Sequence, residues 1–270
     1  MRKPGLVASD VDGTLLDSME RVSGRTAATV QRVVAEGTPF VLVTGRPPRW
    51  MPTVVDGLGV AGVAVCSNGA VLYDTGADRV LDSSTIDSVT LHDVVRELHH
   101  ELPGCAFAVE RTTNGARDRV DDQFLAEEDF RRVWPNSDIR VVPTDQVVGK
   151  PAVKLLALHD KMTSDEMAAV AHEVIGTRLQ LTYSTGAGLI EFSAAGVDKA
   201  SGLRAVAAEL GVEQADVIAF GDMPNDVPML SWAGHGVAMR NAHASALAVA
   251  DEVTGTNNDN GVAQVLERWW

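Results

Sequence analysis

The sequence begins with apolar runs of strand length that alternate with helical patterns, and this alternation is its most restrictive feature. The apolar runs lie at Leu6–Ser9, Phe40–Val43 and Val63–Cys66, and a helical pattern covers residues 24–36. Short continuous apolar runs separated by helices are typical of βαβ units, in which helices cover a parallel sheet on both faces. The first third of the chain therefore predicts a parallel sheet.

The end of the chain repeats this pattern. It predicts a helix over residues 200–210 and strands over 217–220 and 236–239, with a short helix between the two strands. We assign both ends to one α/β core with a Rossmann-like, doubly wound and mostly parallel sheet, formed by residues 1–82 and 186–270.

The intervening segment, residues 83–185, has a different pattern. Helices are predicted over residues 89–101 and 164–175. Apolar runs of strand length lie at 106–110, 140–142, 153–158 and 179–183. These features predict an inserted α+β domain with a sheet of its own.

The charge balance limits the partners of the chain. Among 270 residues, 37 are acidic and 23 are basic, which gives a formal charge of −14. This charge repels nucleic acid and anionic membrane surfaces, so we expect neither as a partner. It also repels phosphorylated substrates, and a phosphate site on this chain must supply positive charge locally, from a metal ion, a lysine or backbone amides.

The cellular compartment is predicted from the cysteines and from the apolar segments. The only cysteines, Cys66 and Cys105, suggest neither a disulfide framework nor a thiolate zinc site. Asp10 and Asp12 interrupt the first apolar run far short of a signal peptide, and the weakly polar stretch at 59–73 is too short to span a bilayer. We therefore expect a cytoplasmic protein.

The first apolar run leads directly into Asp10-Val11-Asp12-Gly13-Thr14. The two-residue period of a strand directs the carboxylates of Asp10 and Asp12 to the same side. Two anions this close repel each other without a bridging cation, and Mg2+ prefers hard oxygen ligands such as carboxylates. A magnesium site is one interpretation, and an acidic turn after a strand is the other.

Two further predicted strands also end in polar residues. Thr44 and Gly45 follow the second run, and a hydroxyl beside unobstructed amides can hold phosphate oxygens. Asp222 follows a strand near the end of the chain and offers another metal oxygen, while Asn225 and Asp226 can orient water, phosphate or a lysine. The plain alternatives are a surface loop and a helix N-cap cluster.

Lys199 lies at the start of the predicted helix over residues 200–210. It is either a solvated helix residue or a cation that neutralises phosphate and the Asp10 carboxylate. Ligands of open parallel sheets bind outside the carboxyl ends of the strands, where Asp10, Thr44 and Asp222 are all predicted to lie. This coincidence favours a ligand site.

Four motifs in this order resemble those of the haloacid dehalogenase superfamily of phosphohydrolases. They are Asp10-Val11-Asp12-Gly13-Thr14, Thr44-Gly45-Arg46, Lys199 and Gly221-Asp222-Met223-Pro224-Asn225-Asp226. The insert between the second and third motifs is similar to the α/β cap of the Cof-type branch, and Ser67-Asn68-Gly69-Ala70 resembles one of its accessory signatures. The resemblance covers nearly the whole chain.

The resemblance implies a role for each matching residue. Asp10 corresponds to the nucleophile and Asp12 to the general acid/base. The implied metal ligands are Asp10, Asp12 through its carbonyl, and Asp222. The implied phosphate-binding groups are the Val11 amide, Thr44, Gly45, Lys199 and Asn225. Asn68, Gly69 and Asp226 are expected to support the site.

The sequence thus predicts a phosphatase that hydrolyses a small phosphate monoester, such as a sugar phosphate, with Mg2+ and no organic cofactor. A phosphomutase or phosphotransferase with the same aspartyl phosphate, or a non-catalytic phosphometabolite-binding protein, remains the alternative. A monomer or a homodimer is expected, and Trp269 and Trp270 mark either an oligomer contact or aromatic rings packed back on the core. His92, His99 and His100 are interpreted as solvated or partly buried helix residues, and Arg46 is left outside the predicted site.

Overall fold

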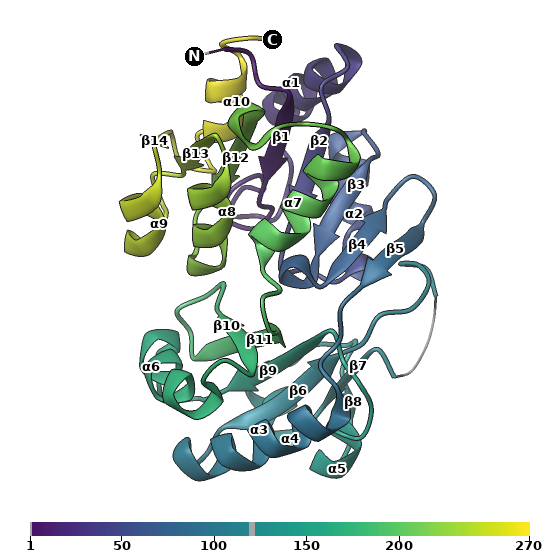
Figure 1. The fold of residues 1–270 in the computed structure, drawn as a ribbon, viewed down its shortest axis with the longest axis vertical. Helices are drawn as coiled ribbons and strands as arrows, with labels where there is room; N and C mark the ends of the chain where they lie inside the picture. Colours follow the sequence, from purple (N-terminus) through teal and green to yellow (C-terminus); the bar gives the residue numbers. More distant parts are fainter. Residues whose placement is uncertain (1, 119–121) are drawn as a thin grey trace. The chain divides into compact units, whose positions relative to one another are not determined.

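The computed structural model describes residues 2–118 and 122–270. The chain divides into two compact units (Figure 1). One, which we call the core unit, comprises Met1–Asp82 and Asp198–Trp270, and the other, the inserted unit, comprises Ser83–Val197.

The core unit is built on a mostly parallel sheet. Its strands are β1 (Leu6–Ser9), β2 (Phe40–Val43), β3 (Val63–Cys66), β4 (Val71–Asp74), β5 (Arg79–Ser83), β12 (Val217–Gly221), β13 (His235–Ala238) and β14 (Glu252–Val253). They lie in the order β14-β13-β12-β1-β2-β3-β4-β5. Neighbouring strands from β14 to β3 are parallel, and β4 runs antiparallel to β3. Since β12 pairs with β1, the two ends of the sequence share one sheet.

Helices cover both faces of this sheet. They are α1 (Gly24–Ala35), α2 (Pro52–Leu58), α7 (Lys199–Glu209), α8 (Val227–Trp232), α9 (Ala244–Val249) and α10 (Gly261–Leu266), with short 3-10 helices η1 (Pro48–Trp50), η2 (Ser67–Gly69), η3 (Gln214–Asp216) and η4 (Pro224–Asp226). Leu6 and Ala8 of β1 pack with residues of α7, α8 and α9. Val7 is buried on the other face, where α1 contacts β2, α2 and α10. Burial on both faces explains why the strands are continuous apolar runs.

The inserted unit has a second sheet of mainly antiparallel pairs. Its strands are β6 (Ala106–Glu110), β7 (Phe124–Ala126), β8 (Arg140–Val141), β9 (Lys154–Leu158), β10 (Leu179–Thr182) and β11 (Leu189–Ala194). Its helices are α3 (Ser88–Glu101), α4 (Glu128–Val133), α5 (Thr144–Val147) and α6 (Ser164–Ile175). The strand order is β10-β11-β9-β6-β7-β8, with β7 and β8 parallel. The apolar stripes of α3 and α6 pack on one face of this sheet.

The structure confirms the predicted α/β fold, with a Rossmann-like, mostly parallel core sheet and a separate α+β segment. The sequence places the end of the inserted domain at residue 185, whereas the inserted unit continues to Val197. The difference arises from β11, which pairs with β9 and β10 and so belongs to the second sheet. An apolar run alone does not indicate which of two sheets a strand joins.

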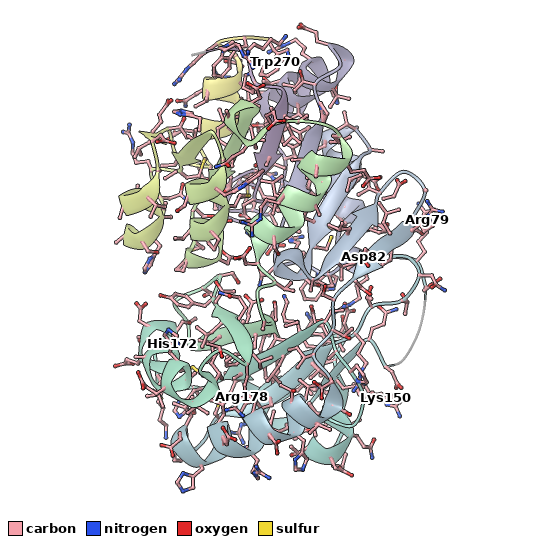
Figure 2. The ribbon with its side chains drawn as sticks, in the orientation of Figure 1. Arg79, Asp82, Lys150, His172, Arg178 and Trp270 are labelled. Atoms are coloured by element: carbon pink, nitrogen blue, oxygen red, sulfur yellow. The ribbon has the colours of Figure 1, made fainter. Side chains whose placement is uncertain are left out.

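The aromatic C-terminus packs back on the core unit. The rings of Trp269 and Trp270 lie 6.1 Å apart, and the Lys3 ammonium lies 4.6 Å from the centroid of the Trp270 ring (Figure 2). Both rings are half-buried. Of the two interpretations of these tryptophans, the contact with Lys3 favours packing on the core. In the part of the chain that the structure describes, no helix is long and apolar enough to cross a membrane.

Candidate active site

Parallel pairing brings three polar strand ends to one edge of the core sheet. β1 lies between β12 and β2, with Ser9 opposite Phe220 on one side and Leu42 on the other. Asp10, Asp222 and Thr44 follow these strands, and the Asp10 amide donates to the Phe220 carbonyl at 2.9 Å. The edge predicted from the sequence is therefore present, and it collects residues that are more than 200 positions apart.

Lys199 places a buried cation at this edge. It is the first residue of α7, and Asp198 caps the helix by accepting a hydrogen bond from the Ser201 amide at 2.7 Å. The fully buried Lys199 Nζ donates to Asp10 Oδ1 at 2.5 Å and to Asp226 Oδ1 at 2.6 Å. Lys199 therefore lies in the site and is not a solvated helix residue.

Asp226 links Lys199 to the loop that carries Asp222. Its Oδ2 accepts from the amides of Asp222 and Met223, each at 2.9 Å. A Cβ atom on Gly221 would lie 2.5 Å from the Asp226 Cβ, so only glycine leaves room for this arrangement. Asp226 is thus fixed by one ammonium and two amides, which is a larger role than the sequence indicated.

Asp222 completes a cluster of buried carboxylates. Its Oδ1 accepts from the Thr14 hydroxyl at 2.9 Å. Gly13 has a φ of +75°, and a Cβ there would lie 2.2 Å from Asp222 Oδ2, so the approach of the two segments requires glycine. One oxygen from each of Asp10, Asp222 and Asp226 lies within 4.8 Å of the others, which is a spacing that suits one metal ion.

The pKa values reflect an excess of negative charge at this cluster. Burial, opposed by Lys199 but reinforced by Asp226 and Asp222, raises the pKa of Asp10 well above its usual range. Burial, with repulsion from Asp226, raises the pKa of Asp222 to about 7. Burial opposes the charged form of Lys199, but Asp10 and Asp226 outweigh it and raise the lysine pKa. A cation at the cluster would relieve this repulsion.

The Asp12 carboxylate pairs with Arg46 and is not part of the cluster. Its two oxygens accept from Arg46 Nε at 2.8 Å and Arg46 Nη2 at 2.5 Å, and its side chain is 52% exposed. The hydrogen bond with Asp12 raises the pKa of Arg46. Arg46, which sequence reasoning left outside the site, is therefore the ion-pair partner of the predicted acid/base. The signal was its position directly after Thr44-Gly45.

The remaining predicted residues gather beside the end of β2. Thr44 and Asn225 are buried, and the Asn225 Nδ2 donates to Asn68 Oδ1 at 3.1 Å. The Asn68 amide donates to the Thr44 carbonyl at 3.0 Å, and a Cβ on Gly45 would lie 3.2 Å from Asn68 Oδ1. Asn68 thus hydrogen-bonds to Asn225 and Thr44 and lies beside Gly45.

Asn241 and His243, which are not among the predicted site residues, support the loops that follow β1 and β12. Val11 is buried, and its carbonyl accepts from Leu15 and Leu16 at 3.0 and 2.9 Å. Asn241 Nδ2 donates to the Gly13 carbonyl at 2.8 Å, and the His243 amide donates to the Asp222 carbonyl at 2.7 Å. Asn241 and His243 follow β13, the next parallel strand. Their position after an apolar strand is the sequence signal that could have identified them.

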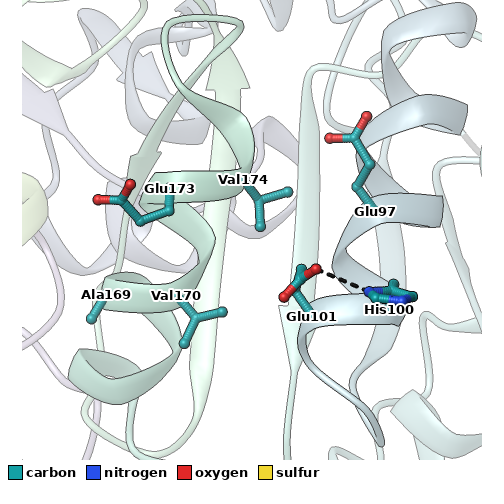
Figure 3. Close-up of a pocket in the computed structure, with 7 residues that line it drawn as sticks. All are labelled: Glu97, His100, Glu101, Ala169, Val170, Glu173 and Val174. Carbon is teal, nitrogen blue, oxygen red and sulfur yellow. Dashed lines mark hydrogen bonds and ion pairs between the residues drawn. The ribbon is translucent and has the colours of Figure 1, made fainter.

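A hollow in the inserted unit does not suit a phosphate. It has a volume of about 690 Å³ and lies between α3 and α6 (Figure 3). It is lined by Glu97, His100, Glu101, Ala169, Val170, Glu173 and Val174. The volume suits a small metabolite, but these lining residues include three carboxylates and no lysine or arginine, so they offer a phosphate neither an ammonium nor a guanidinium group. His100 pairs with Glu101 at 2.9 Å, which agrees with its interpretation as a surface histidine.

Known proteins match the chain over almost its full length. A family model described as haloacid dehalogenase-like hydrolase matches residues 7–266. A Haemophilus influenzae protein, provisionally named a phosphatase, is 30% identical over 263 residues, which cover 97% of this chain and 96% of that protein. The 5-amino-6-(5-phospho-D-ribitylamino)uracil phosphatase YitU of Bacillus subtilis is 28% identical over 280 residues, 99% of this chain and 98% of YitU.

Solved structures show the same fold. A haloacid dehalogenase-like hydrolase from B. subtilis has a TM-score of 0.81 at 24% identity, covering 98% of this chain and 100% of that one. A phosphatase from Bacteroides thetaiotaomicron has a TM-score of 0.80 at 24% identity, covering 98% of this chain and 94% of that one. At this identity the likeness extends to the fold alone.

Proposed function

Because the chain belongs to the haloacid dehalogenase-like hydrolase family and is a phosphatase, we propose that it hydrolyses a small phosphate monoester with Mg2+ through an aspartyl phosphate on Asp10. The family resemblance and the phosphatase class predicted from the motifs are confirmed by the matches above. The metal ion, the intermediate, the residue roles and the substrate are the content of the proposal.

One observation carries the proposal: a buried ammonium lies between two carboxylates at the strand edge, 2.5 Å from Asp10 and 2.6 Å from Asp226. Repulsion normally keeps a carboxylate away from a phosphate dianion. A lysine that contacts the attacking carboxylate offsets this repulsion at the position where the phosphate must bind. This arrangement also meets the need for local positive charge on a chain whose formal charge is −14.

The carboxylate cluster fits Mg2+. With all groups ionised, three carboxylates around one ammonium leave two negative charges in excess, which a divalent cation neutralises. Both Asp226 oxygens already accept hydrogen bonds, so we assign Asp10 and Asp222 as the carboxylate ligands, with the Asp12 carbonyl as a third. When bound, Mg2+ would supply Lewis-acid stabilisation of phosphoryl oxygens.

The chemical steps use Asp10 and Asp12. A carboxylate oxygen of Asp10 attacks phosphorus, the bond from phosphorus to the leaving oxygen breaks, and Asp12, in its protonated form, gives its proton to that oxygen and becomes a carboxylate. Asp12 then takes a proton from water, whose oxygen attacks the acyl phosphate, and inorganic phosphate leaves. Arg46 holds the Asp12 carboxylate at the half-exposed edge of the site, within reach of solvent.

The groups that hold the phosphate lie around these two residues. Lys199 supplies the charged donor. The neutral donors are the Thr44 hydroxyl, the backbone amides of Val11 and Gly45, and the side-chain amide of Asn225. Several donors around one site favour a phosphate over a carboxylate, because a phosphate has more oxygens that can accept hydrogen bonds. Asn68, Gly69 and Asp226 support these donors.

The substrate is proposed to be a sugar or sugar-alcohol phosphate. YitU and a second B. subtilis relative, YcsE, which is 26% identical, are both named for a substrate with a phosphorylated ribityl chain. We assign the choice of leaving group to the inserted unit, Ser83–Val197, which contains none of the proposed catalytic residues. A selecting unit separate from the chemistry can vary without loss of activity.

Asp10→Asn tests the mechanism, because it removes the nucleophilic carboxylate and keeps the shape of the side chain. We expect release of inorganic phosphate from sugar phosphates with Mg2+ to fall by about 10³-fold or more, with unchanged circular dichroism. Asp82→Asn, at an exposed residue of β5, is the matched control and should leave activity unchanged (Figure 2).

Three outcomes would contradict parts of the proposal. Near-normal activity of Asp10→Asn would exclude the aspartyl phosphate. Transfer of the phosphoryl group to added alcohols without free phosphate would identify a phosphotransferase. Full activity of the wild-type protein in EDTA would exclude the metal.

A further inference from the structure

We propose that Asn68 is a positioning residue that orients the amide of Asn225 toward the phosphate. This inference rests on the proposed function, since it assigns a cause to the orientation of one proposed phosphate donor. It concerns only residues of the core unit, and it gives a specific physical cause to the supporting role that the family resemblance implies for Asn68.

The turn that carries Asn68 has an unusual backbone. Ser67, Asn68 and Gly69 have φ values of +50°, +56° and +100°, so three successive residues lie on the left-handed side. This conformation costs free energy for residues other than glycine, although asparagine tolerates it better than most. Glycine is the cheapest residue at such a position. A side chain at position 68 therefore has to contribute something that glycine does not.

The Asn68 side chain contributes a hydrogen-bond acceptor inside the site. It is 1% exposed, and its Oδ1 accepts from Asn225 Nδ2 at 3.1 Å. An asparagine amide has two N–H donors. With one donor held by Asn68, the plane of the Asn225 amide is fixed and the second N–H remains for a ligand. The opposite orientation would place two carbonyl oxygens against each other.

The position of the turn is set independently of Asn225. The backbone N–H of Asn68 donates to the Thr44 carbonyl at 3.0 Å, which connects the turn to the end of β2. A Cβ on Gly69 would lie 2.0 Å from the Asp198 carbonyl oxygen, so Gly69 packs directly against the N-cap of the helix that begins with Lys199. The turn is thus fixed at the β2 loop and at α7, and Asn68 transmits that fixed position to Asn225.

The partners of Asn225 indicate why it needs this support. Asn225 is 5% exposed and lies in the short helix η4. Among residues 2–118 and 122–270, its Oδ1 has no hydrogen-bond partner. The contact with Asn68 is therefore the side-chain hydrogen bond that defines the rotation of this amide. Without it, the donor would be free to turn away from the phosphate.

The test is a double-mutant cycle between Asn68→Gly and Asn225→Ala. Asn68→Gly removes the acceptor and suits the left-handed backbone, so the protein should fold. We measure kcat, KM and competitive inhibition by inorganic phosphate, with sugar phosphate as substrate and Mg2+ present. We expect Asn68→Gly to weaken phosphate inhibition and to raise KM by about tenfold, the loss of one hydrogen bond, with a smaller change in kcat. In the Asn225→Ala background, Asn68→Gly should have no further effect.

Two further variants separate positioning from structural support. Asn68→Ser keeps a side chain, and so a less flexible turn, but its hydroxyl is too short to reach Asn225, and the same tenfold loss is expected. Gln31→Met removes a hydrogen bond from Nε2 to the Leu58 carbonyl, 2.8 Å long and remote from the site, and should lower thermal stability without changing KM.

Each result decides between the inference and the proposed function. Additive losses from Asn68→Gly and Asn225→Ala, or unchanged phosphate inhibition in Asn68→Gly, would overturn the role of Asn68. If Asn225→Ala itself leaves phosphate inhibition unchanged, the proposed phosphate site is wrong, and the fault lies with the proposed function.

Discussion

The raised pKa of Asp222 predicts that ionisation of this side chain destabilises the metal-free protein as the pH rises. The pKa is about 7 in the folded protein and 3.8 in its usual setting. A raised pKa means that the folded state favours the neutral form. The contribution of Asp222 to the free energy of unfolding is complete below its usual pKa. It is lost as the pH rises through the pKa of the folded protein. At 1.36 kcal/mol per pH unit, the loss is about 4 kcal/mol.

Asp222→Asn isolates this effect, because asparagine keeps the shape and cannot ionise. Urea unfolding in EDTA, followed by tryptophan fluorescence, gives the free energy of unfolding of both proteins across this pH range. We expect the value for Asp222→Asn to rise relative to wild type by about 4 kcal/mol from below pH 3.8 to above pH 7. Asp82→Asn should run parallel to wild type.

Parallel curves for wild type and Asp222→Asn would refute this reasoning, as would a wild-type protein that gains stability relative to the variant with rising pH. Mg2+ gives a second test above pH 7. At about 100 times its dissociation constant, it should stabilise wild type by about 2.7 kcal/mol and Asp222→Asn far less.

Two further substitutions test other close contacts of the structure. Gly13→Ala places a Cβ 2.2 Å from Asp222 Oδ2 at a φ of +75°, so we expect a fall of about 1–3 kcal/mol in unfolding free energy and a weaker activation by Mg2+; unchanged activation would contradict the contact. Lys154→Met leaves buried Glu110 and Glu191 without the ammonium that lies 3.6 and 2.8 Å from them, and unfolding free energy should fall by about 3–5 kcal/mol. Replacing all three charged residues by apolar ones should cost much less, and an equal cost would show that packing, not charge, is responsible.

The strand ends of the site were predictable because parallel strands place their carboxyl ends together. Asp10, Thr44 and Asp222 needed only the apolar runs before them and the rule that ligands bind at that edge. Lys199 had two interpretations from the residues alone, since the start of a helix is ordinarily solvated. Its burial depends on the packing of α7 against the sheet, which no local pattern expresses.

The contacts that join loops were not predictable in the same way. Two examples are the ion pair of Arg46 with Asp12 and the hydrogen bonds of two backbone amides to Asp226. Both depend on side-chain directions in turns, and turns have no repeating pattern in the sequence. Strands β4 and β5 were missed because they are the last two strands in the sheet order, where β5 is mostly exposed and has no apolar run. β7 was missed because it has three residues, too few for a period to be read.

Asp226 has a thermodynamic consequence under the proposed function. One carboxylate accepts hydrogen bonds from the Lys199 ammonium and from the backbone amides of the Asp222 loop. The cation that would bind the phosphate and the loop that would bind the metal ion are therefore held by the same side chain. Two ligands that order the same support are coupled, and the coupling is reciprocal. Whatever factor Mg2+ adds to phosphate affinity, phosphate must add to Mg2+ affinity. After hydrolysis, the departure of either ligand therefore weakens the hold on the other.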